Sequence, residues 1–159
     1  LPGGERFIDV SVTVSAATGN LVFKDEKDGC MGIRLRDAFS FKRADSFARN
    51  SEGDDKTTIW GKRAKWVQYE AVVDGGWHGV VAFDHPANPG FPTRWHARDY
   101  GLLSANPFGE KVFDPKSGQA GGFTIRSDQS ATWRYRFVFY ASRKNASQAC
   151  ALGPAEPAG

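Results

Sequence analysis

Apolar and polar residues alternate along two long segments of the chain, which is the pattern of β-strands with one buried face. Residues 7–15 alternate valine or isoleucine with serine, threonine or aspartate. Residues 133–140 place aromatic side chains on one face and two arginines on the other. We therefore expect a buried row from each segment, made of Ile8, Val10, Val12, Trp133, Tyr135, Phe137 and Phe139.

Turn residues separate these segments from further short strands. Residues 65–73 and 77–83 are two strand-like runs joined by Asp74-Gly75-Gly76, which predicts a β-hairpin. Prolines at positions 86, 89 and 92 indicate a loop, and residues 42–56 are polar and aperiodic, so we read them as a loop with at most a short helical turn. Roughly six or seven strands without an amphipathic helix predict a mainly β fold, an antiparallel β-sandwich. We expect one β domain over residues 1–145 and a flexible tail over residues 146–159.

Composition supports this fold and narrows the class of protein. The chain has 159 residues, enough for one domain with a sizeable core, and 13% of them are aromatic, which favours strands. No apolar run approaches the roughly 20 residues that span a bilayer, so we expect a soluble protein that does not enter a membrane. The first residues lack the basic and apolar regions of a signal peptide, and nothing else in the sequence indicates a compartment.

The net charge of +3 raises the question of nucleic-acid binding. Acidic residues interleave the basic ones, as in residues 24–28, and the densest basic group, residues 62–65 beside Trp60, is typical of a solvated face. We therefore expect no nucleic-acid partner and favour a small molecule or a glycan.

The densest chemistry lies between Asp84 and Gly109. If residues 93–100 are extended, a period of two places Arg94, His96, Arg98 and Tyr100 on one face and sends Trp95 and Ala97 toward the core. Guanidinium groups bind carboxylates, phosphates or sugar hydroxyls, and an imidazole can transfer protons near neutral pH. We expect this row to line a concave surface, with Asp84, His85 or Glu52 across it.

Each candidate has a structural alternative. The catalytic candidates are His96, His85, Asp84 and Glu52, and the substrate-binding candidates are Arg94, Arg98, Tyr100, Trp60 and Asn106. The two histidines and the aspartate could instead satisfy backbone groups, and the arginines could form plain ion pairs. The tryptophans could belong to the core, and residues 106–109 could form a turn.

Metal, cofactor and thiol chemistry stay open. Histidines and carboxylates supply enough nitrogen and oxygen ligands, but their spacing matches no recognised metal motif; they are His78, His85, His96, Glu52, Asp84 and Asp99. No cofactor can be specified. Cys30 and Cys150 match no redox or metal spacing, so they form either a disulfide or two ordinary thiols.

Residues 84–101, with Asn106-Pro107-Phe108-Gly109, resemble a bacterial family of unknown function whose members often carry the label "methane oxygenase PmoA". Residues 50–53 and 60–69 resemble earlier blocks of the same family. The resemblance implies that the chain corresponds to the C-terminal half of longer members, whose N-terminal half carries a His-rich Asp-His-Pro-His-His-Arg-Gly motif. By fold analogy it also implies part of a galactose mutarotase-like supersandwich. Methane oxidation itself is excluded, because the methane monooxygenase subunit of that name is a membrane protein, whereas this chain has a mean hydropathy of −0.47.

Two functions fit these residues. The first is a carbohydrate-active enzyme of hydrolase, lyase or epimerase type, with His96 as general acid or base and Asp84 or Glu52 as its partner carboxylate. The second is a non-catalytic carbohydrate-binding or interaction module that uses the same aromatic and polar groups. Activity lost in His96→Ala favours the first, and glycan affinity retained in that variant favours the second.

Overall fold

Antiparallel strands make up most of the regular structure, as the alternation predicts. The computed structural model describes residues 4–141 and 146–154. Its strands are β1 (Arg6–Ser15), β2 (Leu21–Phe23), β3 (Met31–Arg34), β4 (Ser46–Asn50), β5 (Trp66–Val73), β6 (Gly76–Asp84), β7 (Arg94–Ala97), β8 (Leu102–Asn106), β9 (Phe123–Ile125) and β10 (Ser130–Ala141), and its helices are the short 3-10 helix η1 (Asp37–Phe39) and the α-helix α1 (Ala146–Ala151). No helix in the described ranges is long and apolar enough to cross a membrane.

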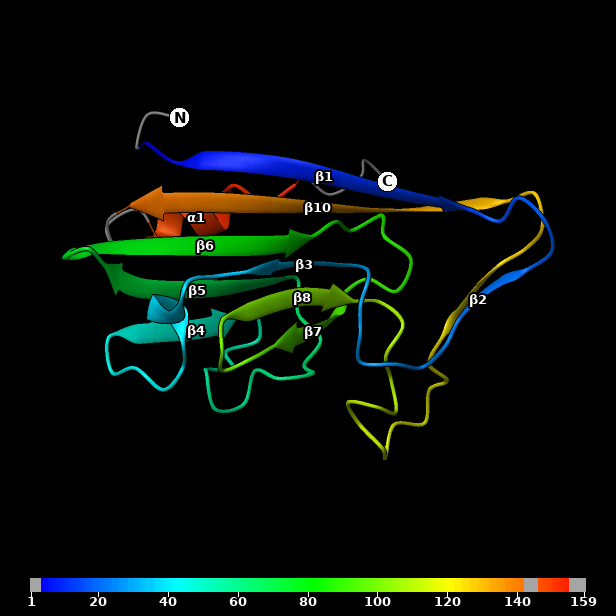
Figure 1. The fold of residues 1–159 in the computed structure, drawn as a ribbon, viewed down its shortest axis with the longest axis horizontal. Helices are drawn as coiled ribbons and strands as arrows, with labels where there is room; N and C mark the ends of the chain where they lie inside the picture. The colour runs from blue at the N-terminus through cyan, green and yellow to red at the C-terminus, as the bar shows by residue number, and fades with distance from the viewer. Residues whose placement is uncertain (1–3, 142–145, 155–159) are drawn as a thin grey trace.

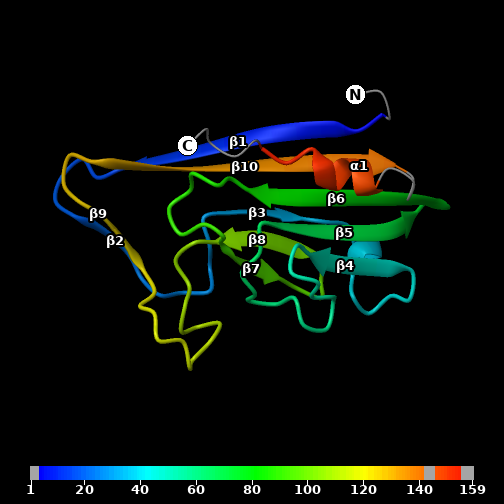
Figure 2. The same ribbon diagram turned by 180° about the vertical axis from the view of Figure 1, so that it is seen from behind.

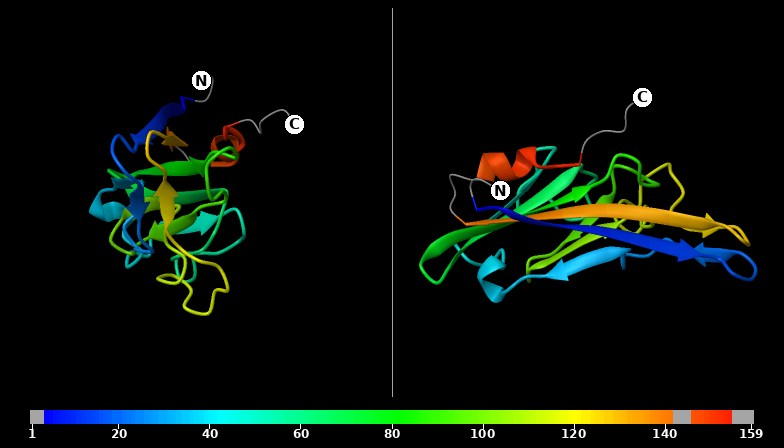
Figure 3. Two further views of the ribbon diagram at one scale, coloured as in Figure 1. Left: turned by 90° about the vertical axis from the view of Figure 1, so that its right-hand side faces the viewer. Right: turned by 90° about the horizontal axis from the view of Figure 1, so that it is seen from above.

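The strands form two stacked sheets and a small ribbon (Figure 1). The large sheet has five strands in the order β1-β10-β6-β5-β4, and the small sheet has three in the order β3-β8-β7. The ribbon of β2 and β9 extends from the far end of β1 and β10 (Figure 2). Seen from above, α1 lies on one face of the large sheet and β3 on the other (Figure 3). We call the face that carries α1 the outer face of the large sheet.

Two apolar layers follow from this stacking. The main core lies between the sheets, where Val80 and Trp133 of the large sheet belong to one cluster with Trp95 and Leu103 of the small sheet. A second, smaller cluster covers the outer face, where Val81 packs with Ala149 of α1 and other residues. Strand β6 is apolar on both faces for this reason, as strands covered on both sides generally are.

The predicted hairpin is present. Strands β5 and β6 pair with Val73 opposite Gly76, so Asp74 and Gly75 form a two-residue turn. Both turn residues have positive φ, 50° and 81°, as a type I′ turn requires. Aspartate tolerates this conformation and glycine prefers it, which is why the Asp-Gly pair predicts the turn.

The interpretation of residues 42–56 as a loop is wrong in part. Residues 46–50 form β4, the edge strand beside β5. The buried members of β4 are Ser46, Ala48 and Asn50, and none of them is a large apolar residue. Buried and exposed residues alternate along β4, but apolar and polar residues do not, so the sequence pattern does not indicate a strand.

The predicted core is correct for β10 and wrong for the start of β1. Trp133, Tyr135 and Phe137 are buried, and Phe139 is half-buried. Val10 and Val12 are also half-buried, but Ile8 is 55% exposed. Val10 and Val14 pack against the main core, whereas Ile8 belongs to neither apolar cluster, so in the described structure no second layer covers the apolar face of β1 at this position.

The expected tail is partly described. Residues 146–151 form α1, and Ala149 is buried against the outer face. Residues 155–159 lie outside the described ranges.

Candidate functional site

In strand β7, alternate side chains lie on opposite faces, as predicted, over four residues. Trp95 and Ala97 are buried in the core, while Arg94 and His96 occupy the other face of the small sheet. The strand ends at Ala97, where the chain turns toward β8, so Arg98 and Tyr100 do not continue the row. The turn places the Tyr100 ring beneath two guanidinium groups, those of Arg34 at 4.7 Å and Arg98 at 5.5 Å.

His96 is enclosed by protein groups and is 5% exposed. Its Nδ1 lies 3.0 Å from the Lys27 carbonyl oxygen, which can only accept, so Nδ1 carries the proton. The rings of Trp60 and Phe113 approach it edge-on at 6.3 and 5.9 Å. Burial lowers the pKa of His96 and favours its neutral form. Within the described residues its ring makes no hydrogen bond or ion pair with a carboxylate.

Arg94 belongs to a buried ion-pair network. Its Nε and one terminal nitrogen donate to the two carboxylate oxygens of Glu110, at 3.0 and 2.7 Å. Arg63 donates to the same carboxylate at 2.7 Å, and the Ser117 hydroxyl also donates to it. These four contacts lower the pKa of Glu110 to about 2, Arg94 having the largest effect. Glu110 lies in an irregular loop, and its sequence neighbours gave no signal of this role.

The Asp84 carboxylate stabilises the loop that follows β6 through two hydrogen bonds. Its two oxygens accept from the Asn88 side-chain amide and from the Thr93 backbone N–H, each at 2.7 Å. Burial raises the pKa of Asp84 to about 6, against the effect of these hydrogen bonds. The Asn88 side chain also bonds to the backbone of Arg134 in β10, donating to its carbonyl and accepting from its N–H at 2.7 Å each. Much of the polar chemistry of this stretch therefore holds the loop on the large sheet.

The remaining candidates are spread over the molecule. Glu52 is exposed in the turn after β4 and accepts from the Ser51 hydroxyl. Asn106 is buried, and its side chain bonds to the backbone N–H groups of residues 108 and 109 and to the carbonyl of residue 26. His85 lines a hollow on the outer face of the large sheet, and His96 lies on the far side of the small sheet. These residues therefore do not share one cleft in the described structure.

The side chains that could bind a metal do not cluster in the described structure either. Within the described ranges, no group of three or more histidine, cysteine, aspartate or glutamate side chains is close enough to hold a metal ion. Cys30 and Cys150 are free thiols, and burial raises the pKa of both.

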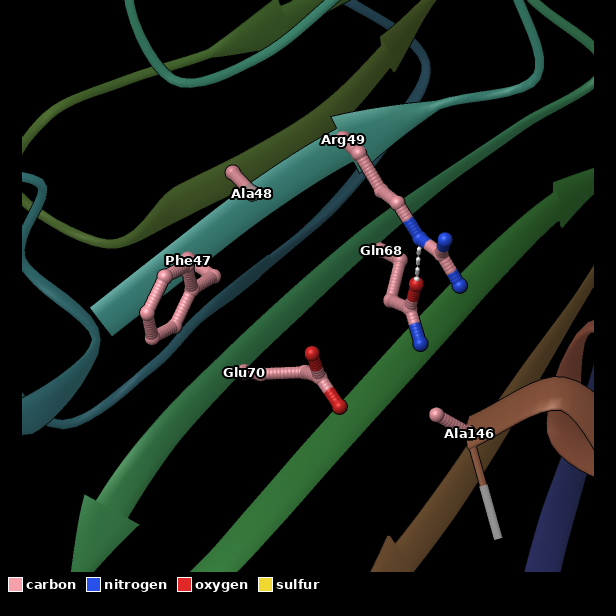
Figure 4. A pocket seen from close by; sticks show the side chains of 6 residues that line it. All are labelled: Phe47, Ala48, Arg49, Gln68, Glu70 and Ala146. Carbon is pink, nitrogen blue, oxygen red and sulfur yellow. Dashed lines mark hydrogen bonds between the residues drawn. The ribbon is translucent and has the colours of Figure 1, made fainter. Parts of the chain in front are cut away.

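A hollow of about 350 Å³ on the outer face is lined by residues that the sequence did not single out (Figure 4). Arg49 of β4 lies opposite Gln68 of β5, and Phe47 lies opposite Glu70 in the same register. Period two therefore places all four side chains on one face, and Ala146 of α1 closes the far side. Phe47 is 43% exposed, and its ring packs against Trp77 with centroids 5.6 Å apart.

Hydrogen bonds orient the polar floor of this hollow. The Arg49 Nε donates to the Gln68 Oε1, and the Gln68 Nε2 donates to the Tyr140 hydroxyl. That hydroxyl in turn donates to a Glu70 carboxylate oxygen at 2.9 Å. The Tyr140 ring lies directly over Gly79, where any Cβ would come within 2.1 Å of it. The lack of a side chain at position 79 thus allows the chain of hydrogen bonds to form. We call this hollow the Phe47 hollow and take it as the candidate site, because hydrogen bonds orient its polar side chains.

Comparison with known proteins gives one match. Neither the curated proteins nor the solved structures include a significant relative. A family model matches residues 1–152, nearly the whole chain. On this evidence the chain belongs to the family of unknown function DUF6807.

Proposed function

We propose that this protein is a carbohydrate-binding module and that it holds a sugar ring in the Phe47 hollow. The observation that carries the proposal is an exposed aromatic ring, Phe47, beside polar groups that hydrogen bonds orient on the outer face of the large sheet. A pyranose has an apolar face of C–H groups and a rim of hydroxyls. An aromatic ring can stack on the first, and paired donors and acceptors can bind the second.

The polar groups offer both kinds of hydrogen bond. Arg49 carries guanidinium N–H donors beyond those that contact Gln68 and the Cys150 sulfur, and the Glu70 carboxylate, which already accepts from Tyr140, can accept several hydrogen bonds. Gln68 is buried and bonded at both ends of its amide, so its orientation is fixed before any ligand arrives. Such preorganisation lowers the entropy cost of binding.

The alternative, an enzyme with His96 as acid or base, has weaker support. Its mechanism needs a carboxylate within hydrogen-bonding reach of the imidazole or of the same substrate. The described contacts of His96 are a backbone carbonyl and two aromatic rings, and His96 does not line the Phe47 hollow. Binding without catalysis therefore agrees better with the geometry.

The test is a binding assay with a panel of neutral and acidic oligosaccharides, measured by calorimetry or by NMR shifts. Phe47→Ala should weaken the affinity for the bound sugar about tenfold, since a lost stacking contact is worth roughly 1.4 kcal/mol. Phe7→Ala is the matched control, because Phe7 is 48% exposed on the opposite edge strand. It should leave affinity unchanged.

Two results would count against the proposal. One is the absence of binding to any sugar of the panel, and the other is equal affinity of wild type and Phe47→Ala. Turnover of a sugar substrate by the wild type, abolished by His96→Ala, would favour the enzyme instead.

We further propose that the chain corresponds to the C-terminal half of the longer proteins labelled "methane oxygenase PmoA", within a galactose mutarotase-like supersandwich. One side of β1 has no partner strand among the described residues, which supports this proposal because a further strand could add there. The structure of a longer relative would test the idea. It should contain the order β1-β10-β6-β5-β4 with another strand beside β1.

A further inference from the structure

A second hollow, of about 400 Å³, opens on the outer face between β1, β10 and the loop after β6. Its polar lining comes from distant parts of the chain: Asp9, Ser11, His85, Arg134 and Arg136, with Pro154 at one side. We call it the His85 hollow. It lies on β1 and β10, whereas the Phe47 hollow lies on β4 and β5, so the two share no lining residue.

Backbone contacts fix His85 beside Arg134. The Asn88 side chain bonds to both the N–H and the carbonyl of Arg134, and the His85 N–H donates to the same carbonyl at 3.3 Å. Asn88 is itself buried and held by Asp84. The loop therefore cannot move His85 away from β10 without breaking several hydrogen bonds.

Another backbone contact determines the proton position on His85. Its Nδ1 lies 3.1 Å from the Ala87 backbone N–H and accepts from it. A nitrogen that accepts carries no proton, so the proton is on Nε2, which is a donor. Hydrogen bonding to Ala87 thus selects the tautomer that offers an N–H to a ligand.

The charges in the hollow favour an anion. Arg136 donates to both oxygens of Asp9, at 2.6 and 2.8 Å, and to the Leu152 carbonyl at 3.1 Å. Asp9 is thereby neutralised by Arg136. The guanidinium of Arg134 is exposed and makes no hydrogen bond or ion pair with another described residue. One positive charge, the His85 donor and the Ser11 hydroxyl then line the same hollow.

We infer that the His85 hollow binds a small oxyanion, a phosphate or carboxylate group, through Arg134, His85 and Ser11. A planar guanidinium suits either group because its N–H donors match two oxygens at once. The inference does not rest on the proposed sugar binding, since it uses other residues and another part of the face.

The experiment titrates the full chain with inorganic phosphate and, separately, with acetate, at constant ionic strength kept by chloride. The His85 side-chain NMR signals report binding. We expect saturable shifts with at least one anion, and Arg134→Ala should weaken the affinity by about tenfold or more. Arg126→Ala is the control, because Arg126 is exposed elsewhere on the molecule, and it should bind like the wild type.

Each outcome decides the question. Tighter binding of phosphate assigns a phosphate group to the site, and tighter binding of acetate assigns a carboxylate. Shifts that do not saturate, or equal losses in the two arginine variants, would overturn the inference. Phe47→Ala should leave anion binding unchanged, so failure of the sugar proposal would not be mistaken for failure of this one.

Discussion

Replacing Glu110 by glutamine removes the charge at the centre of the buried ion-pair network. The side chain is 4% exposed and accepts from Arg94, Arg63 and Ser117. In the variant, one amide oxygen and one NH₂ group face donors that were arranged for a carboxylate. Arg94, whose side chain is 11% exposed, loses its main counter-charge.

The pKa of Glu110 gives the magnitude. Its ordinary pKa is 4.5, and the network lowers this to about 2. At about 1.4 kcal/mol per pKa unit, the shift corresponds to roughly 3 kcal/mol. A carboxyl group whose pKa is lowered by folding adds this amount to the free energy of unfolding at pH values above its ordinary pKa. The contribution is lost as the pH falls from 4.5 toward about 2. The variant should therefore be less stable by about 3 kcal/mol near neutral pH, and the difference should shrink in acid.

Urea unfolding followed by tryptophan fluorescence measures both effects. Glu52→Gln is the matched control, because Glu52 is exposed in a turn, and it should change the free energy of unfolding by less than about 0.5 kcal/mol. A loss below about 1 kcal/mol for Glu110→Gln, or a loss independent of pH, would refute this reasoning.

Three other predictions concern stability and use the same assay. Asp84 should act in the opposite sense to Glu110, because its pKa is raised from 3.8 to about 6. The free energy of unfolding should therefore fall by up to about 3 kcal/mol as the pH rises from 3.8 to about 6, and Asp84→Asn should abolish this fall. Phe137→Ala should cost about 3–5 kcal/mol as a buried aromatic deletion, and a loss below about 1 kcal/mol would contradict its inward register. Gly79→Ala should cost about 1–3 kcal/mol because its methyl group meets the Tyr140 ring, and an unchanged stability would mean that this ring is loosely held.

Sequence patterns predicted the fold where burial and hydrophobicity coincide. β10 alternates large aromatic residues with arginines, and the Asp-Gly turn marks the hairpin of β5 and β6, so both were found. β4 was missed because its buried side chains are serine, alanine and asparagine. Ile8 was placed in the core because alternation shows that a strand has an apolar face but not whether another layer covers it.

Site prediction failed to identify the hollows for a related reason. The alternation of side chains correctly placed Arg94 and His96 on one face of β7. The residues that contact them come from loops, and no local sequence pattern predicts where those loops lie. Glu110 reaches Arg94 from sixteen residues away. The Phe47 hollow needs the cross-strand register of β4 and β5, which was not predicted because β4 was taken for a loop.

The edge position of β1 has a consequence for its dynamics. Its backbone pairs with β10 on one side only, so every second N–H group along its ten residues has a sheet partner. Amide hydrogen exchange should accordingly be slow and fast at alternate residues of β1, whereas residues 135–139 of β10, which pair with both β1 and β6, should all be protected. Detachment of β1 would break one ladder and leave the pairing of β10, β6, β5 and β4 intact, so β1 can open without unfolding the rest of the large sheet.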